Sequence, residues 1–585
     1  MAKVLGVVGA RLNSSRLPAK HLLDLAGKPL IARLFERLEL IPEIDRLVLA
    51  TTDDAYNRPL VEWAQHNNKK VFAYSGDVND LVGRVDALVQ DEKPEIVIYF
   101  CGDSPLIEPS TVSNLIRGLL SEPKAEFIEL EAPANGNKPI HEGFSVYRRA
   151  VWNRIVQQAK LPEEREHVGA SLRRFVDVLR RKTIAEDPIF SSIRQRISVD
   201  TPSDYQFMSE IYRRWYAGHD AASIVSLRWV IDELRRDAAL AAINADVQQK
   251  TVGDTSRNAL IVCHAGAGIG LGHLSRSLTV ARALQDRIFA GVRLLIQGDP
   301  VDRPDLALIP HRYIGSSQDL SAAIMREVEA KRTDVVVFDI HPQRIPKNLP
   351  GLLGQLRAQR IHLVAIDSLL AFCDQFDFIQ IPSFYIDPAK LSRCHNPVYY
   401  GWDCYLLEKS ESRKDWSPGS KVLVLTGGSD ATQLGRTLPG ELDAKLPAGT
   451  EVHWVRGPYA EQPRLPVQPR TRWVVHDAPA GLGELMARSN YALTVYGVSF
   501  FELLQHGVPT VVFSPYGEKD QPELEKIMQQ KVALVAADDF AAVAALRNLM
   551  GSPAAAEAMS LTAREKMDEK GALRFADRIK ALVSR

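Results

Sequence analysis

The chain has 585 residues, which is too long for one hydrophobic core and predicts several α/β domains of roughly 150 residues each. Hydrophobic residues make up 45% and charged residues 25%, which is typical of soluble globular proteins and excludes a disordered or collagen-like chain. The 72 basic residues equal the 72 acidic residues, so no global positive field is available to bind a nucleic acid.

The first residues predict neither a signal peptide nor a membrane segment. Met1-Ala2-Lys3 leads directly into a short apolar run, and no run of about 20 apolar residues follows. The five cysteines contain no C-x-x-C pair, so we expect reduced thiols rather than a disulfide framework or a zinc knuckle. We therefore expect a cytoplasmic protein that has no membrane partner.

Short apolar runs alternate with longer amphipathic stretches along the chain, which predicts strands and helices that alternate around parallel sheets. Ligands of such sheets bind at the carboxyl ends of the strands, so the loops that follow the apolar runs are candidate sites. The expected strands are residues 4–8, 47–50, 96–101, 260–263, 335–338, 363–366, 422–425, 452–455, 492–495 and 510–513.

Two interruptions divide this pattern. A polar stretch at residues 250–258 follows a charged helical segment and precedes a new strand, as a domain linker would. The strand pattern restarts again near residue 419. We therefore expect three domains, one Rossmann-like domain at 1–255 and two Rossmann-like lobes at 256–415 and 416–585.

The loop after the first expected strand carries three cations and two adjacent serines, in the sequence Gly9-Ala-Arg-Leu-Asn-Ser-Ser-Arg-Leu-Pro-Ala-Lys20. Backbone N–H groups at Gly9 and the serines can approach phosphate oxygens, and Arg11, Arg16 and Lys20 offer charge-assisted hydrogen bonds. Ala10 and Ser15 are the other expected ligands in this loop. The loop is therefore a candidate triphosphate site. A solvated basic turn is the alternative interpretation.

Two carboxylates farther along the chain are candidate metal ligands. Asp103 lies in Gly102-Asp-Ser-Pro105, directly after the strand at 96–101, and Asp200 lies in Val199-Asp-Thr-Pro-Ser-Asp204. Mg²⁺ prefers hard oxygen ligands, often one or two carboxylates together with substrate phosphates. Asp103 and Asp200 are thus candidate Mg²⁺ ligands for a bound nucleoside triphosphate, although Asp200 could instead belong to a helix start.

These motifs, together with Gly27-Lys-Pro-Leu30 and Ala50-Thr-Thr-Asp-Asp54, resemble the spore-coat-polysaccharide type of cytidylyltransferase, a relative of the CMP-sialic acid and CMP-Kdo synthetases. The resemblance covers about residues 1–250 and implies a GT-A-like nucleotidyltransferase domain. It also implies that the Arg–Lys loop binds the CTP phosphates, with Arg11 and Lys20 as catalytic cations, and that Asp103 and Asp200 bind magnesium.

The implied reaction is attack of a sugar-acid hydroxyl on the α-phosphate of CTP, with pyrophosphate leaving. The expected acceptor is a nonulosonic or Kdo-like acid, and a homodimer through this domain is included among the expected partners. Asn13 departs from the glycine that is usual in the family. Arg165-Glu-His-Val168 either positions the sugar or forms a charged helix face.

The strand expected at 260–263 leads into a second glycine-rich loop, His264-Ala-Gly-Ala-Gly-Ile-Gly-Leu-Gly-His273-Leu-Ser-Arg-Ser277. A strand, a glycine turn and a helix in this order favour a phosphate or sugar site, and Gly270 and Gly272 belong to it. His273 at the start of the helix can act as a general acid or base. Alternatively, this histidine caps or packs against the turn.

The last lobe contains two more strand-to-helix turns, Thr426-Gly-Gly-Ser-Asp430 and Tyr496-Gly-Val-Ser-Phe-Phe-Glu502. Glu502 can accept hydrogen bonds from both ribose hydroxyls, or it can be a first-turn acid that the helix dipole favours. The other expected UDP-sugar ligands in this lobe are Gly428, Ser429, Gly497, Ser499, Asp520 and Gln521.

Together, Gly268-Ile-Gly-Leu-Gly-His-Leu-Ser-Arg276 and the two later turns resemble the GT-B superfamily over about residues 258–585, and in particular the UDP-sugar hydrolases of pseudaminic acid synthesis. The family's catalytic histidine falls on His273, and the implied hydrolysis needs no cofactor. Two positions depart from the family: Asp339 precedes Ile340-His341 instead of an Asp-x-Tyr pattern, and Asp367-Ser368 replaces a pair of aspartates.

We therefore predict a bifunctional nucleotide-sugar enzyme of nonulosonic acid (pseudaminic, legionaminic or sialic-like) biosynthesis. Its N-terminal half would transfer CMP from CTP to a sugar acid with Mg²⁺, and its GT-B-like half would hydrolyse a UDP-linked amino-deoxy sugar. A glycosyltransferase or a non-catalytic sugar-binding module is the alternative for the C-terminal half.

Overall fold

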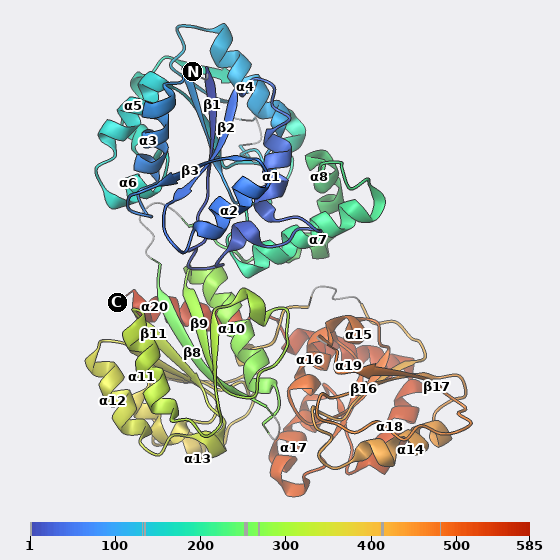
Figure 1. Ribbon diagram of the computed structural model, residues 1–585. Coiled ribbons are helices and arrows are strands. Elements are labelled where there is room, and N and C mark those ends of the chain that lie inside the picture. Colours follow the sequence, from blue (N-terminus) through green and yellow to red (C-terminus); the bar gives the residue numbers. More distant parts are fainter. Residues whose placement is uncertain are drawn as a thin grey trace. The chain divides into compact units, whose positions relative to one another are not determined.

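A computed structural model describes residues 3–131, 133, 136–250, 256–266, 269–410, 415–479 and 481–584. Gly268 of the second glycine-rich loop and residues 251–255 of the expected linker lie outside the described residues. The chain forms two compact units, Met1–Ser256 and Arg257–Arg585. We describe each unit by itself (Figure 1).

The N-terminal unit contains a seven-stranded sheet in the order β3-β2-β1-β4-β6-β5-β7. The sheet is mixed, since β6 runs antiparallel to both β4 and β5, whereas the sequence predicted parallel strands only. Strands β5, β6 and β7 carry no apolar run longer than two residues, so the pattern of residues did not reveal them. The strands are β1 (Val4–Gly9), β2 (Arg46–Thr52), β3 (Lys70–Tyr74), β4 (Ile96–Cys101), β5 (Phe127–Leu130), β6 (Phe144–Arg148) and β7 (Arg181–Ile184).

Helices cover both faces of this sheet (Figure 1). One apolar layer includes Phe35 of α1 and Ile116 of α4, and the other includes Val85 of α3 and Trp152 of α5. The helices are α1 (Leu30–Leu38), α2 (Arg58–His66), α3 (Leu81–Glu92), α4 (Pro109–Ser121), α5 (Arg149–Gln158), α6 (Pro162–Glu166), α7 (Pro202–Gly218), α8 (Leu227–Arg236) and α9 (Ala238–Ala242).

The C-terminal unit contains two parallel sheets, in the orders β10-β9-β8-β11-β12-β13-β14 and β17-β16-β15-β18-β19-β20. In each sheet the strand order reverses beside the first strand, β8 or β15, as in doubly wound nucleotide-binding folds. The first sheet consists of β8 (Asn258–Ala265), β9 (Gly291–Gly298), β10 (His311–Ile314), β11 (Val335–Asp339), β12 (His362–Ile366), β13 (Phe378–Gln380) and β14 (Val398–Tyr399). The second consists of β15 (Lys421–Leu425), β16 (Glu451–Arg456), β17 (Arg472–Asp477), β18 (Tyr491–Val495), β19 (Thr510–Phe513) and β20 (Leu534–Val535). The predicted α/β class with two Rossmann-like lobes is confirmed.

The last helix, α20, belongs to the core of the first of these lobes although it follows the second lobe in sequence. Its Phe575 and Ile579 are fully buried in the same apolar cluster as Leu284 of α10. The helices of this unit are α10 (Gly272–Ile288), α11 (Leu320–Ala330), α12 (Leu349–Ala358), α13 (Pro388–Leu391), α14 (Leu438–Lys445), α15 (Gly483–Ala487), α16 (Val498–His506), α17 (Gln521–Gln530), α18 (Asp539–Met550), α19 (Pro553–Lys566) and α20 (Gly571–Val583).

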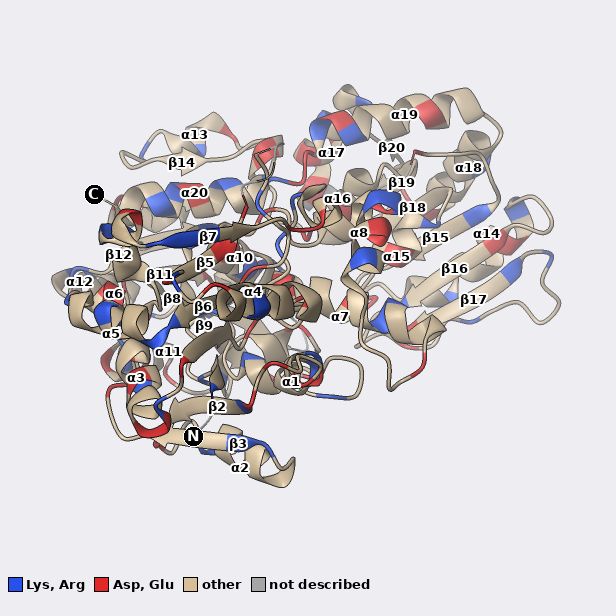
Figure 2. Ribbon diagram, turned by 90° about the horizontal axis from the view of Figure 1, so that it is seen from above, with Lys and Arg blue, Asp and Glu red and all other residues tan. Residues whose placement is uncertain are grey.

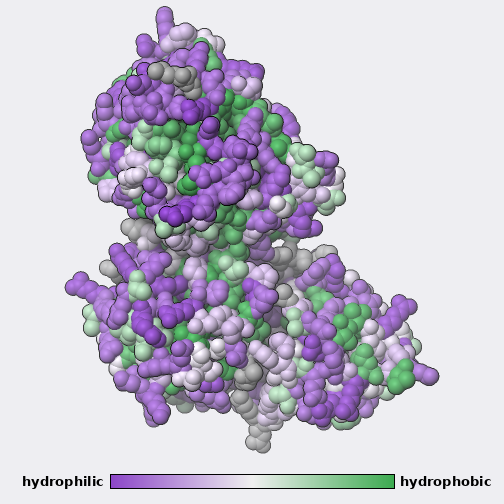
Figure 3. Space-filling model, viewed as in Figure 1, coloured by the Kyte–Doolittle hydropathy of each residue, from purple (hydrophilic) through white to green (hydrophobic). Residues whose placement is uncertain are grey.

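The surface is polar and its charges are mixed. Figure 2 shows basic and acidic residues interspersed along the helices and loops of both units. Hydrophilic residues predominate on the face shown in Figure 3, and apolar residues form scattered groups on it. Among the helices that the structure describes, none has the length and apolar character needed to cross a membrane.

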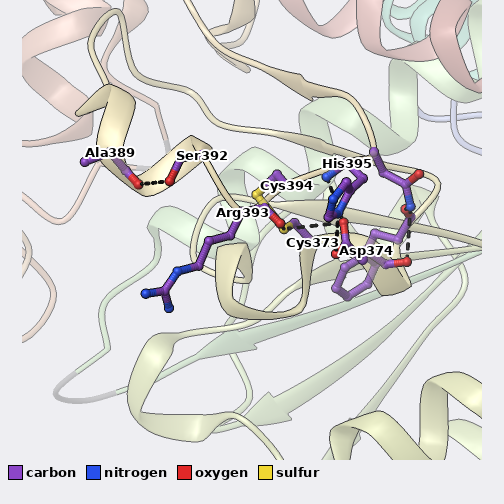
Figure 4. The surroundings of a disulfide bond; sticks show 9 residues. Cys373, Asp374, Ala389, Ser392, Arg393, Cys394 and His395 are labelled. Atoms are coloured by element: carbon purple, nitrogen blue, oxygen red, sulfur yellow. Dashed lines mark hydrogen bonds and ion pairs between the residues drawn. A yellow bond between two sulfur atoms is a disulfide. The ribbon is translucent and has the colours of Figure 1, made fainter.

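Cys373 and Cys394 form a disulfide, so the expectation of five reduced cysteines is wrong for this pair (Figure 4). Their Cα atoms are 5.5 Å apart, which is within the usual range for a disulfide. The bridge connects the 3₁₀ helix Leu370–Gln375 with the turn after α13, where the backbone N–H of His395 donates to Asp374 Oδ1 at 2.8 Å. The two cysteines lie 21 residues apart in sequence, a spacing that carries no pairing signal.

Candidate functional sites

The carboxyl edge of the N-terminal sheet brings Lys20, Asp103 and Asp200 together. Strands β1 and β4 pair so that Gly9 lies opposite Cys101, and the loops that follow both strands therefore begin side by side. The Lys20 ammonium lies 2.6 Å from Asp103 Oδ2 and 2.8 Å from Asp200 Oδ1. Burial opposes the charge on Lys20, but the two carboxylates hold its pKa above the ordinary value.

Asp200 has two further basic partners. Arg16 lies 3.2 Å from Asp200 Oδ1, and Arg196 contacts both Asp200 and Asp204. Although burial favours the neutral acid, Lys20 and the two arginines keep the pKa of Asp200 well below its usual range. The cluster therefore holds an ionised carboxylate away from bulk water.

The backbone around Asp200 is fixed by the start of α7. The N-cap of this helix is Thr201, whose hydroxyl accepts from the backbone N–H of Asp204 at 3.3 Å. The Asp204 carboxylate accepts in return from the backbone N–H groups of Thr201 at 3.2 Å and of Asp200 at 3.0 Å. Asp200 thus precedes a capping box, and its own side chain remains directed at the cations.

Arg11 lies away from this cluster. Its guanidinium donates to Asn79 Oδ1 at 2.7 Å and pairs with Glu166 at 2.9 Å, while Arg165 pairs with Asp80. The motif that contains Arg165 therefore contributes ion pairs to the segment that leads into α3. Asn79 and Asp80 were not identified from the sequence, because polar residues before a helix are indistinguishable from an ordinary cap there.

The other residues expected to bind CTP phosphates differ in exposure. The backbone N–H of Ala10 donates to Ala50 O at 3.2 Å, so it takes part in a backbone bond to β2. Ser15 is exposed in the same loop. Arg16 and Lys20 are the two loop cations that lie with the carboxylates.

His21 and Arg84 are buried polar residues beside this site that the sequence did not single out. His21 Nδ1 lies 3.0 Å from the carbonyl oxygen of Arg11, and burial lowers the pKa of this imidazole to about 4. Since a carbonyl only accepts, the neutral ring donates from Nδ1. Arg84 is 2% exposed and donates to Val78 O at 2.7 Å. Within the described part of the chain its Nε has no hydrogen-bond partner, and burial lowers its pKa.

The second site lies at the carboxyl edge of the sheet that contains β8. Asp339, the last residue of β11, is fully buried, and its Oδ1 lies 2.6 Å from Nδ1 of His273 in the first turn of α10. Burial favours the neutral acid, but Arg276 and His273 outweigh it and lower the pKa of Asp339 to about 2. The ionised carboxylate can only accept, so His273 donates from Nδ1 and its Nε2 is the nitrogen left to exchange a proton.

Arg276 joins two strand ends at this site. Its Nε donates to Asp339 Oδ2 at 2.8 Å, and its guanidinium lies 3.4 Å from Asp367 in the turn after β12. From the sequence, Asp339 and Asp367 had been noted only as departures from a family pattern. Their contacts with α10 form only in the folded sheet, so no local sequence pattern indicates them.

Two further histidines surround His273. His264 is fully buried, accepts from the backbone N–H of His341 at 2.9 Å and lies 3.2 Å from Gln297, while burial lowers its pKa to about 4. The ring of His341 lies edge-on to that of His273, with centroids 5.7 Å apart. The residue that departs from the family's Asp-x-Tyr pattern therefore lies close to the candidate catalytic histidine.

The last lobe places its predicted residues at the ends of β15, β18 and β19. Gly428 and Ser429 are exposed in the turn after β15, and Asp430 closes that turn by accepting from the backbone N–H of Leu434 at 2.9 Å. Gly497 precedes α16, while Asp520 accepts from Ser514 at 2.6 Å just before Gln521 begins α17.

Glu502 lies in the second turn of α16 with Ser499 as a hydrogen-bond partner. Burial, assisted by the nearby charge of Glu408, raises the pKa of Glu502 to about 7. This glutamate therefore changes its charge near neutral pH, which a solvated first-turn acid would not do.

Comparison with known proteins agrees with the N-terminal architecture. Residues 5–218 match a family model described as Cytidylyltransferase. The 3-deoxy-manno-octulosonate cytidylyltransferase of Escherichia coli is 34% identical over 124 residues, which are 21% of this chain and 48% of that protein. An uncharacterized protein of Methanocaldococcus jannaschii is 22% identical over 249 residues, 43% of this chain and 97% of that protein. The chain thus spans less than half of the Escherichia coli relative.

Solved structures resemble each part of the chain. A cytidylyltransferase from Leptospira borgpetersenii aligns with 43% of this chain and 99% of its own length, at 20% identity and a TM-score of 0.37. Phytolacca americana UGT2, complexed with UDP-2fluoro-glucose and pterostilbene, aligns with 56% of this chain and all of its own, at 15% identity and a TM-score of 0.41. The family match over residues 5–218 and the sheet topologies confirm a nucleotidyltransferase-like N-terminal domain followed by a double Rossmann-like region.

Proposed function

We propose that the N-terminal unit transfers CMP from CTP to a sugar acid and releases pyrophosphate. The observation that carries this proposal is the cluster of Lys20, Asp103 and Asp200, which lies at the carboxyl edge of the sheet within the region that matches the cytidylyltransferase model. The acceptor would be a nonulosonic or Kdo-like acid. The name of the Escherichia coli relative supports an acid of the second kind.

The residues present fit a magnesium ion. Asp103 and Asp200 each place a carboxylate oxygen within 3 Å of one buried cation, the Lys20 ammonium, so the two oxygens converge on a single position. Among the described residues no three His, Cys, Asp or Glu side chains could hold a metal together. Two carboxylates suffice, because Mg²⁺ bound with a nucleotide takes its other ligands from phosphates and water. Bound there, Mg²⁺ would neutralise charge on the phosphates.

The side chains of the site would position the triphosphate. Arg16 and Lys20 would bind phosphate oxygens as charge-assisted donors. His21 would fix the backbone of the candidate triphosphate loop, residues 9–20. Its buried neutral ring has one N–H, which donates to the Arg11 carbonyl oxygen. Rate acceleration would then come from orientation and charge neutralisation, with no side chain needed as a strong base.

We infer that the C-terminal unit cleaves a UDP-sugar by transfer to water. His273 Nε2 would accept a proton from water while the water oxygen bonds to the anomeric carbon and the bond to UDP breaks. Asp339 supports this assignment because it fixes the tautomer and would stabilise the imidazolium that forms. Glu502 would bind the ribose hydroxyls.

A glycosyltransferase is the second candidate for this unit. The pairing of His273 with Asp339 could equally deprotonate a sugar hydroxyl, and His341 replaces the tyrosine of the hydrolase pattern beside it. UDP release from the donor and water alone would support hydrolysis. A strict need for an acceptor would support transfer, and absence of any turnover would favour a binding module.

The direct test is mass spectrometry of reaction products on the full chain. CTP and Mg²⁺ are supplied with a panel of nonulosonic and Kdo-like acids, and separate reactions contain UDP-linked diacetamido sugars. The expected products are a CMP-sugar acid with pyrophosphate, and a free sugar with UDP. Equal use of UTP or ATP by the N-terminal unit would overturn the assignment to cytidylyl transfer.

A further inference from the structure

The Lys20 ammonium occupies the position between the two carboxylates toward which a divalent cation would be drawn. It bridges Asp103 and Asp200 at 2.6 and 2.8 Å, and its side chain is only 7% exposed. The lysine therefore provides charge that a metal would otherwise supply.

We propose that Lys20 is an internal counter-cation that holds the metal position until CTP binds, and then transfers to the phosphates. This inference rests on the proposed Mg²⁺-dependent cytidylyl transfer. Without nucleotide, a divalent ion must displace the lysine from two ion pairs. With nucleotide, the triphosphate offers the ammonium other anionic partners, so the carboxylates become available to the metal.

The side chains around Lys20 favour movement of its ammonium alone. Lysine carries its charge on a flexible four-carbon stem and binds as a point charge. Its neighbour His21 is 3% exposed and bonded to the Arg11 carbonyl, which fixes the backbone on that side. Arg196 remains on Asp200 and keeps that carboxylate ionised when the lysine leaves. The metal and CTP are then expected to increase each other's affinity, because both require Lys20 to leave the two carboxylates and that displacement is needed only once.

The experiment measures Mn²⁺ binding to the full chain without nucleotide, by electron paramagnetic resonance of the free ion. The Lys20→Met variant should bind one Mn²⁺ about tenfold or more tightly than the unmodified protein, since a positive charge beside the site is gone. Lys28→Met is the matched control, because Lys28 is 46% exposed and pairs with Glu36 instead. Its Mn²⁺ affinity should be unchanged.

Equal Mn²⁺ affinity of Lys20→Met and the unmodified protein would overturn the inference. Thermal unfolding provides a second readout: without CTP, Mn²⁺ should raise the Tm of Lys20→Met and Lys20→Gln more than that of the unmodified protein. Equal Tm shifts in the variants and the unmodified protein would also contradict the inference about Lys20.

Failure of the proposed metal site itself is distinguishable. The unmodified protein with CTP, and without a sugar acid, should retain more Mn²⁺ than CTP alone and more than the Asp103→Asn variant with CTP. If all three bind alike, the metal site is absent and both proposals fall. If this difference is found while Lys20→Met shows no gain, only the role of Lys20 fails.

Discussion

The two candidate sites place an aspartate at the end of a strand and bring a basic residue to it from the segment after the first strand of the sheet. In the N-terminal unit, Lys20 bridges two carboxylates that are partly open to water. In the C-terminal unit, His273 and Arg276 share one fully buried carboxylate, Asp339. The carboxyl ends of paired parallel strands therefore present two different arrangements of charged side chains in the two units.

The difference lies in how many carboxylates converge and in which cation neutralises them. Under the proposal, two carboxylates that face one lysine would bind a metal in its place when the lysine moves to the phosphates, which suits phosphoryl transfer. One buried carboxylate that is also bonded to an arginine cannot exchange partners so readily, and under the proposal it would orient a histidine for proton transfer instead. Substitutions at one site should therefore leave the reaction at the other site unchanged.

The largest effect is expected for Asp103→Asn. An amide would remove a proposed metal ligand and a partner of Lys20, so CMP transfer should fall by about 10³-fold or more, while UDP release by the C-terminal unit stays unchanged. Pyrophosphate and UDP release measured on the same preparation check both halves. Asp177→Asn is the control, because that side chain is 87% exposed. A loss below tenfold would argue against a role for Asp103 in the reaction.

The reciprocal change is His273→Ala. UDP-sugar turnover should fall by about 10²- to 10⁴-fold because the acid–base group is gone, and pyrophosphate release should be unaffected. UDP release followed by chromatography measures the loss. His311→Ala is a suitable comparison, since this exposed histidine bonds to the carbonyl of Ile309. Unchanged turnover would exclude His273 as the acid–base residue.

Removal of the disulfide should destabilise the C-terminal unit and leave the stability of the N-terminal unit unchanged. Closing a loop of about 20 residues stabilises a fold by about 3 kcal/mol in the chain-entropy account. The Cys373→Ser, Cys394→Ser double variant should therefore lower the unfolding free energy of the C-terminal unit, with the N-terminal transition unchanged. Denaturant unfolding measures this, and a reductant should affect only the unmodified chain. A variant as stable as the parent would contradict the prediction.

The smallest effect concerns Glu502. Because burial raises its pKa to about 7, the fraction that is ionised and able to accept from ribose hydroxyls increases between pH 6 and 8. UDP affinity should rise by up to about tenfold over this range and should be flat in Glu502→Gln. Titration calorimetry at each pH tests the slope. The control is Glu484→Gln, whose side chain is 73% exposed, and this variant should keep the pH dependence of UDP affinity.

The same pKa shift has a consequence for stability. The folded state binds the proton more tightly than the unfolded chain, whose pKa is near 4.5, so the native protein should lose roughly 1–3 kcal/mol as pH rises from about 4.5 to above 7. The Glu502→Gln variant should not show this part of the loss. Parallel stability profiles of the two proteins would mean that Glu502 keeps an ordinary pKa.

The sequence predicted those parts of the fold that depend on local apolar pattern. The central strands and the turns after them were found because a buried parallel strand is a continuous apolar run. Strand β7, Arg181–Ile184, has a largely polar sequence and pairs at the edge of the sheet, so nothing local identifies it. The disulfide could not be predicted either, because its two cysteines lie far apart in sequence and meet only in the folded chain.

The candidate site residues show the same limit. Arg16 and Lys20 could be proposed because they belong to a charged loop after a strand, and Asp103 because it follows a strand. Asp200 was proposed as a second carboxylate, with support from the family resemblance, and the structure brings all four residues into contact. The carboxylate partner of His273 could not be assigned, because Asp339 lies 66 residues away and meets it only through the pairing of β8 with β11.

The capping box at the start of α7 ties one catalytic candidate to the folding of a helix. Thr201 and Asp204 fix the backbone on which Asp200 stands, and Asp204 also holds Arg196. A substitution at Thr201 would thus change the chemistry without touching a ligand. In a mutational scan of this protein, residues that serve only helix initiation would be scored as active-site residues. Natural variation at this turn would be restricted both by the start of the helix and by the position of Asp200.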